Sequence, residues 1–224
     1  MDFASEVLSL LEQNPDILKR IIFSDEANFH VNGHMNGWNC CFYAQQNPNF
    51  VVDEPLHSPK LVVWCGVSWK RIIGLFVFKT EDGVATMVNG SSYRAMLEHF
   101  LFPQLQDEDD FINDHFFFQQ DGATAHTAYD TITLLRQHFP GKLISRKGDT
   151  QWPARSPDLT PLDFWLWGML KHRVYSTPIR DLEHLEQRIS EEIGAITAEE
   201  RQSALLSFEA RLQKTLDIGG RHIE

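Results

Sequence analysis

The stretch LVVWCGVSWKRIIGLFVF (residues 61–78) decides the fold. It holds two apolar, β-branched runs, at residues 61–69 and 72–78, and the pair Lys70-Arg71 separates them. Two such runs joined by a short polar turn are typical of an antiparallel β-hairpin. The sequence therefore predicts a hairpin here, and the segments on either side of it supply the other elements of the fold.

Three more strand-like segments lie outside the hairpin, at residues 20–24 (RIIFS), 115–120 (HFFFQQ) and 143–145. Apolar periodicity and end signals predict helices at residues 3–13, 91–105, 125–139, from 160 onward, at 181–196 and from 197 onward. The order of these elements predicts an α/β fold, in which helices flank a mixed sheet of about five strands and further helices follow at the C-terminal end.

The bulk composition is that of one globular domain, which is expected to span residues 1–224. No apolar stretch is long enough to span a membrane, and the N-terminus lacks the basic flank of a signal peptide. The three cysteines, of which Cys40 and Cys41 are adjacent and Cys65 is distant, make a poor disulfide framework. A reducing compartment is therefore expected.

The formal net charge of −11 argues against a protein that binds DNA through its overall electrostatics. The acids concentrate at residues 106–111 and 181–200, whereas residues 142–155 are locally basic. That strip holds Lys142, Arg146, Lys147 and Arg155 against the single acid Asp149. A basic strip on an acidic chain is compatible with substrate DNA and equally typical of a solvated loop.

Two aspartates follow directly on apolar strands. Asp25 comes after residues 20–24, and Asp121 comes after residues 115–120. Strand ends are where open α/β sheets place their ligands. Two carboxylates at one sheet edge repel each other unless cations share the site, and hard oxygen ligands suit Mg²⁺ or Mn²⁺.

A third acid is expected near the start of the helix at residue 160, where Asp158 and Asp163 are the candidates. Asp158 stands in a Ser-Pro-Asp turn and is expected to serve the backbone there. Asp163 lies at the border of the apolar stripe of the helix, so it can face a sheet edge, and it is the preferred residue.

Taken singly, each acid has an ordinary structural explanation. Asp25 could be a strand-end turn residue, and Asp121 with Gly122 is a turn signal. Asp163 stands three residues after Thr160, as in a capping box. Their joint arrangement is what favours a functional site.

Three motifs carry a resemblance to mariner-type transposases. They are FSDE (23–26) with FHVNGH (29–34), QQDGATAH (119–126) and WPARSPDLTPLDFWLWG (152–168), and the similarity extends over nearly the whole chain. The family's aspartates fall on Asp25, Asp121 and Asp163. The 41 residues between the last two (122–162) are more than in the best-known mariner elements and resemble a variant lineage.

The resemblance implies an RNase H-like fold and a DNA transposase activity, with phosphodiester cleavage and strand transfer at two Mg²⁺ or Mn²⁺ ions. Asp25 would bridge both ions, while Asp121 and Asp163 would each hold mainly one. The implied partners are DNA, as transposon ends and target, with a homodimer left open and with no membrane or small-molecule cofactor. Nuclear localisation is expected, as is the absence from this chain of the family's N-terminal helix-turn-helix domains.

Two other functions stay open at this stage. One is a catalytically silent, transposase-derived module for nucleic-acid binding or interaction, and the other is a metal-dependent RNase H-like nuclease. A zinc site at His30, His34, Cys40 and Cys41 is disfavoured, because its spacing matches no common pattern. Glu26 is left out of the site because it points away from Asp25 in an extended chain, and His126 is expected to make local hydrogen bonds.

Overall fold

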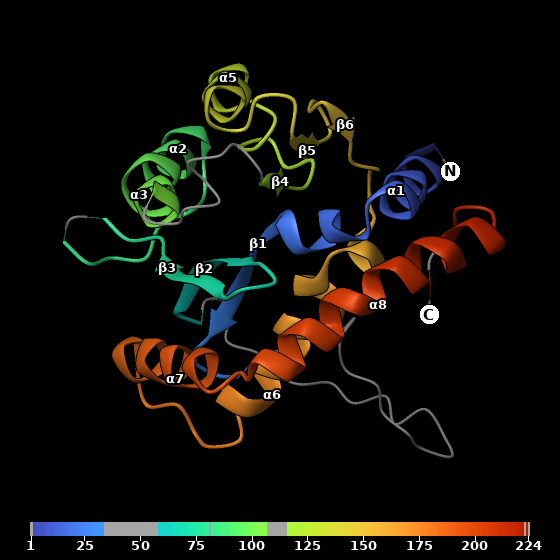
Figure 1. Ribbon diagram of the computed structural model, residues 1–224. Helices are drawn as coiled ribbons and strands as arrows, with labels where there is room; N and C mark the ends of the chain where they lie inside the picture. The colour runs from blue at the N-terminus through green and yellow to red at the C-terminus, as the bar shows by residue number, and fades with distance from the viewer. Residues whose placement is uncertain (1, 34–57, 81, 107–115, 222, 224) are drawn as a thin grey trace, which may run out of the picture.

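The computed structural model of the protein describes residues 2–33, 58–80, 82–106, 116–221 and 223. They contain a six-stranded sheet in the order β3-β2-β1-β4-β5-β6 (Figure 1). Its strands are β1 (Ile21–His30), β2 (Lys60–Val67), β3 (Ile72–Val77), β4 (Phe117–Gln119), β5 (Leu143–Ser145) and β6 (Thr150–Gln151). The first three are antiparallel neighbours, whereas β4, β5 and β6 run parallel to β1. The predicted hairpin and mixed sheet are therefore confirmed.

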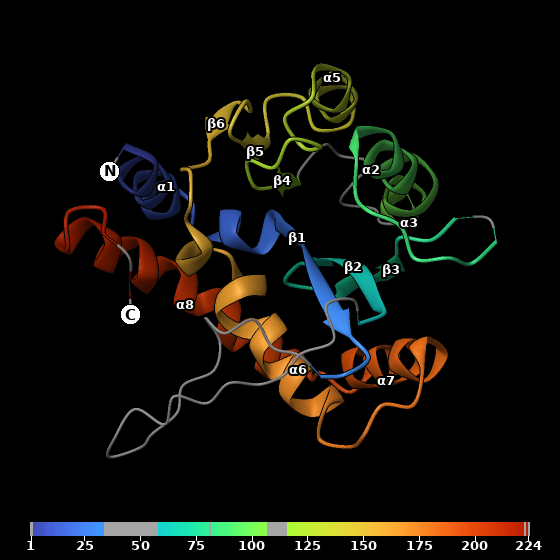
Figure 2. The same cartoon turned by 180° about the vertical axis from the view of Figure 1, so that it is seen from behind.

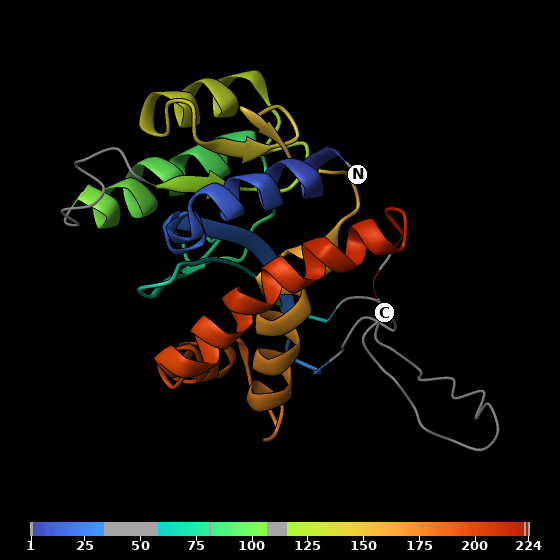
Figure 3. The same cartoon turned by 45° about the vertical axis from the view of Figure 1, so that its right-hand side comes forward.

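Helices cover both faces of this sheet (Figures 1 and 2). One face carries α2 (Gly90–Met96), η3 (Leu97–Leu101), α3 (Phe102–Gln106) and α5 (Tyr129–His138). The other face carries α1 (Asp2–Gln13), η5 (Leu162–Leu166), α6 (Trp167–Val174), α7 (Leu182–Gly194) and α8 (Ala198–Asp217). Figure 3 shows α1 alongside α8, with which it is in contact. None of the helices in the described part of the chain is both long and apolar enough to cross a membrane.

The central strands separate two hydrophobic cores by simple alternation. In β1, Ile22 packs with Trp64 in the core under α2, α3 and α5, while Phe23 packs with Val63 in the core under α6 and α8. Successive side chains of a strand point to opposite faces, so a strand covered on both faces is apolar at every position. This explains why the motif IIF at the start of β1 is continuously buried.

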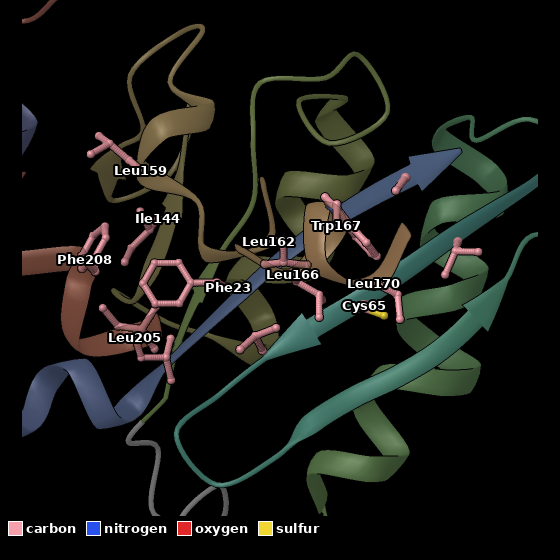
Figure 4. Packing of buried hydrophobic residues seen from close by; sticks show 14 of the residues in the cluster. Phe23, Cys65, Ile144, Leu159, Leu162, Leu166, Trp167, Leu170, Leu205 and Phe208 are labelled. Carbon is pink, nitrogen blue, oxygen red and sulfur yellow. The ribbon is translucent and has the colours of Figure 1, made fainter. Parts of the chain in front are cut away.

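The helix that follows Pro161 begins with a wide turn. Residues Leu162–Leu166 are wound as a π-helix, a form that is rare and frequently found at functional sites. Its apolar residues Leu162 and Leu166, together with Trp167 of α6, are buried against β1 (Figure 4). Asp163, which is next to Leu162 in the chain, is exposed at the edge of this packing.

Two boundaries differ by several residues from those predicted, and one strand was not predicted. The strand predicted at 20–24 continues to His30, because antiparallel pairing with β2 extends over Phe23 to His30. The helix predicted to start at residue 125 begins at Tyr129, because residues 123–127 first form a separate turn. β6 was not predicted, since a strand of two residues has no detectable periodicity.

Candidate active site

The two central strands diverge at one point, and two of the predicted aspartates lie there. The parallel pairing of β1 with β4 ends at the partners Phe23 and Gln119. The Ser24 hydroxyl donates to the Gln119 carbonyl over 2.7 Å and so closes the last contact between the strands. Asp25 and Asp121 each stand two residues beyond this last pair. Asp25 is thus inside β1, not after its end as predicted, but it lies where β1 has already lost its β4 neighbour.

Asp25 is held by the helix on one face of the sheet. Its carboxylate accepts a hydrogen bond of 2.8 Å from the indole Nε1 of Trp167. Burial raises the pKa of Asp25 well above its ordinary value, and the negative charge of Asp163 is the next cause. The hydrogen bond from Trp167 acts in the opposite direction. The structure therefore brings Asp163 within electrostatic range of Asp25, although the two residues are 138 positions apart in the sequence.

Asp163 is also close to Asp121, the other predicted aspartate. Asp163 is exposed as a residue but lies in the wall of a cavity, and partial desolvation there, followed by the negative charge of Asp121, raises its pKa to about 6 against the positive charge of Lys171. Asp163 makes no capping box with Thr160, since the helix that follows Pro161 has no side-chain cap hydrogen bond. Asp121 and Asp163 line one cavity with a volume of about 390 Å³. Asp163 thus lies near both Asp25 and Asp121, the two acids that stand just beyond the last paired residues of β1 and β4.

Asp121 is oriented by the turn that follows it. Its Oδ1 accepts a hydrogen bond of 2.9 Å from the Ala123 backbone and contacts Nδ1 of His126 at 2.5 Å. Burial favours a raised pKa for Asp121, but the hydrogen bond and charge of His126 outweigh it, so the pKa lies below the ordinary value. Asp121 is therefore the member of the group that is ionised most readily.

His126 links Asp121 to a fourth carboxylate. Its other ring nitrogen, Nε2, lies 3.1 Å from Oε1 of Glu26, which extends from β1 to the opposite side of the sheet from Asp25. His126 is only 2% exposed. Burial lowers the pKa of His126, but Glu26 and then Asp121 raise it to about 10 overall. The local contact to Asp121 matches the sequence prediction, whereas the contact to Glu26 spans 100 positions and no local pattern signals it.

Buried polar residues support the turn that carries His126. The Gln120 side chain donates to the His126 carbonyl over 3.0 Å and to the Ser145 hydroxyl over 3.1 Å. The Tyr93 hydroxyl donates to the Gln120 side chain over 2.9 Å. This network ties β5 and α2 to the turn, so the position of Asp121 depends on the whole sheet.

The remaining acid of the third motif, which was predicted to serve the backbone of its own turn, binds the backbone of a distant segment. Asp158 accepts a hydrogen bond of 3.0 Å from the backbone of Ile223, and its carbonyl accepts one from Arg211. The disfavoured zinc site falls mostly outside the described residues, which include His30 but not His34, Cys40 or Cys41. Trp167 lies in the core, and no local pattern in the sequence signals its hydrogen bond to Asp25.

The carboxylates of Asp25, Asp121 and Asp163 are suitable ligands for a divalent cation, although they are not arranged as a complete metal site in this structure. Within the described ranges, no three His, Cys, Asp or Glu residues are grouped closely enough to hold a metal ion. Burial is the main cause of the raised pKa values of Asp25 and Asp163, and repulsion from a neighbouring carboxylate adds to it in both cases. Carboxylate oxygens are the ligands that Mg²⁺ and Mn²⁺ prefer. A cation between these carboxylates would relieve their mutual repulsion.

A mixed sheet with helices on both faces, and with carboxylates at the divergence of its two central strands, defines a domain of the RNase H-like class. The fold is that of the catalytic domain of Mos1 mariner transposase, with a TM-score of 0.73 and 19% identity, covering 100% of this chain and 93% of that one. A pre-cleavage Mos1 transpososome matches with a TM-score of 0.80 and 17% identity, covering 100% of this chain and 62% of that one.

The sequence is also homologous to that of a transposase. It is 28% identical over 209 residues to the transposable element Tc3 transposase of Caenorhabditis elegans. This match covers 91% of the chain and 57% of the Tc3 protein, so the chain spans little more than half the length of that relative. No protein-family model matches the chain. The resemblance to mariner-type transposases, and the RNase H-like fold that it implied, are confirmed.

Proposed function

We propose that the chain is the catalytic domain of a metal-dependent DNA transposase, which cleaves phosphodiester bonds and transfers DNA strands. The observation that carries this proposal is that Asp163 lies within electrostatic range of both Asp25 and Asp121, which follow the last paired residues of β1 and β4. Homology to Tc3 transposase and the fold of the Mos1 catalytic domain support it.

The three aspartates Asp25, Asp121 and Asp163 would hold two divalent cations. When bound, such ions lower the pKa of an attacking water, or position a DNA 3′-hydroxyl, and stabilise the departing oxygen. Solved structures of the Mos1 catalytic domain with raltegravir contain Mg or Mn, which supports the choice of cation.

Other residues of the chain would keep these ligands in place. Trp167 orients Asp25 through its indole N–H, and His126 orients Asp121. The Lys171 ammonium lies within electrostatic range of Asp25 and Asp163, and burial lowers its pKa. Lys171 therefore offsets part of the negative charge before a cation arrives.

The substrate would be duplex DNA at transposon ends, followed by target DNA, in the nucleus. Solved Mos1 complexes include a paired-end complex with the left transposon end. By analogy, two copies of the protein would act on a pair of ends.

Cleavage assays with the isolated chain test the proposal. Supercoiled plasmid DNA and an RNA–DNA hybrid are incubated with increasing Mg²⁺ or Mn²⁺, and joining of a 3′-hydroxyl oligonucleotide to the plasmid measures strand transfer. Metal-dependent cleavage and joining of DNA are expected. Cleavage of the hybrid alone would indicate an RNase H-like nuclease, and DNA binding without cleavage would indicate a silent module.

Alanine variants of the aspartates assign the site. Asp25→Ala, Asp121→Ala and Asp163→Ala should each reduce DNA cleavage by at least about 100-fold, because each removes a ligand of the transition-state cations. Asp130→Ala is the matched control, since Asp130 is exposed on α5 and lies outside the cavity. Cleavage that survives in the Asp163→Ala protein would refute the assignment.

A further inference from the structure

The cavity at the active site carries charges of both signs. Asp121 and Asp163 contribute to its lining, and the guanidinium side chains of Arg146 and Arg155 do as well. The two arginines come from the segment between β5 and η4 (Pro157–Leu159), which contains β6. A cavity lined by carboxylates alone would repel a phosphodiester, so the arginines change what the cavity can accept.

Arg146 is placed in the cavity by packing. It follows β5 directly, and its aliphatic stem lies over the backbone of Gly122, next to Asp121. A Cβ atom added to Gly122 would stand 3.1 Å from Cδ of Arg146, so a larger residue would displace that side chain. The absence of a side chain at Gly122 thus gives Arg146 its position beside the catalytic carboxylates.

Arg155 is held in an unfavourable backbone conformation. Its φ of 56° lies in the left-handed region, and no other residue except glycine adopts a positive φ in the described part of the chain. Such a conformation costs about 1 kcal/mol or more and persists where the surrounding structure requires it, often at functional sites. Here it accompanies a cationic side chain at the cavity wall.

The side chains of Arg146 and Arg155 have no polar partner among the described residues. Within the described residues, Arg146 and Arg155 make no hydrogen bond or ion pair, although both are close to acids of an acidic chain. By contrast, Arg173 and Arg188 are paired with glutamates. The planar guanidinium group, with its fork of N–H donors, matches the geometry of phosphate oxygens.

We propose that Arg146 and Arg155 form a subsite for the DNA backbone, which binds phosphodiester groups next to the bond being cut. This inference rests on the proposed function, because it takes DNA as the substrate. The arginines would offset the charge of the aspartates and hold the DNA backbone across the cavity. A protein with a net charge of −11 can then bind a polyanion through a local contact.

Fluorescence anisotropy with labelled duplex DNA, in metal-free buffer so that no cleavage occurs, tests the subsite. Arg146→Ala and Arg155→Ala should each weaken binding about 5- to 10-fold, and each should reduce the slope of log K against log salt by about one. The loss should be the same on two unrelated DNA sequences, because phosphate contacts do not depend on the bases. Arg180→Ala is the matched control, since Arg180 is exposed and lies outside this cavity.

Arg155→Asn separates charge from backbone strain. Asparagine tolerates the left-handed conformation but carries no charge, so this variant should remain folded and bind DNA as weakly as Arg155→Ala. The proposal is overturned if the double variant Arg146→Ala/Arg155→Ala binds DNA with the affinity and salt slope of the Arg180→Ala protein. A loss confined to one DNA sequence would overturn it too. These readouts need no catalysis, so failure of the transposase assays is distinguishable from failure of the subsite.

Discussion

His126 is a titratable residue whose two ring nitrogens each contact a carboxylate. It is buried between Asp121 and Glu26, and these two carboxylates hold its pKa at about 10. A raised pKa in the folded state means that the folded protein binds a proton that the unfolded chain releases near pH 6.5. The stabilisation from His126 is therefore complete below about pH 6.5 and is lost as the pH rises toward 10.

Replacement of His126 by alanine should show this pH dependence. In metal-free buffer at pH 6, we expect His126→Ala to lower the free energy of unfolding by about 1–3 kcal/mol, because Glu26 and Asp121 lose their shared partner. The difference from the unmodified protein should shrink between pH 6.5 and 10, as measured by urea unfolding. A difference that stays constant or grows over this range would contradict the charge pairing.

Removal of the Asp163 charge should stabilise the folded protein, whereas removal of His126 should destabilise it. Its pKa of about 6 lies above the ordinary value of 3.8, so ionisation of Asp163 destabilises the folded state as the pH rises through this interval. In metal-free buffer at pH 7, Asp163→Asn should raise the free energy of unfolding by about 1 kcal/mol, a value reduced from the full shift because solvent screens this exposed group.

Thermal unfolding at several pH values checks the Asp163→Asn prediction. The gain should disappear below about pH 4, where the native carboxyl group is protonated as well. Added Mg²⁺ should stabilise the unmodified protein more than the variant, because the variant lacks one ligand. A variant that is less stable than the unmodified protein at pH 7 without metal would show that Asp163 is not under electrostatic strain.

At the scale of elements, the helix after Pro161 connects the core to the site. Trp167 packs edge-on against Phe29 of β1, with ring centroids 6.2 Å apart, and donates its indole hydrogen to Asp25. The wide turn at Leu162–Leu166 places Asp163 and Trp167 on the same short segment. The element thus supplies one carboxylate and orients another.

Trp167→Phe tests this double role. Phenylalanine keeps much of the apolar contact but cannot donate to Asp25, so we expect a loss of about 1 kcal/mol in unfolding free energy. The Mg²⁺ concentration for half-maximal DNA cleavage should rise several-fold, because Asp25 is less well oriented. Trp165→Phe is the control on the same helix, and an equal rise in metal requirement for both variants would contradict the proposed role of Trp167.

Comparison of the predicted and observed elements shows which sequence signals were sufficient to place a helix or a strand. The helix predicted from residue 197 onward is α8, which begins with a capping box between Thr197 and Glu200, and the apolar runs correctly predicted β2 and β3. Such signals act between residues a few positions apart, so the sequence contains them directly. The start of α5 at Tyr129 was not predictable in this way, because the preceding turn is held by Gln120 and the elements around it.

At the scale of the whole molecule, one sheet joins two cores. Phe208 of α8 packs on Phe23 with ring centroids 5.0 Å apart, and Leu101 is buried in the core on the other face. Because β1 and β2 contribute alternate residues to both cores, we expect the two faces to unfold together.

Phe208→Ala and Leu101→Ala test this coupling. Each should lower the free energy of unfolding by about 3 kcal/mol, through lost burial and a cavity. Far-UV and near-UV circular dichroism should report a single coincident transition in both variants. Separate transitions for the two probes in either variant would show that the cores are independent units.

The sequence by itself determined the order of the elements and the identity of Asp25, Asp121 and Asp163 as candidate ligands. These follow from alternation, caps and motifs, whose physical causes operate between near neighbours in the chain. Only the tertiary structure decided that β1 and β4 diverge after Phe23 and Gln119, that His126 joins Glu26, and that Trp167 holds Asp25. Those contacts join residues about 95 to 140 positions apart, and they depend on strand register and helix packing, which no local pattern specifies.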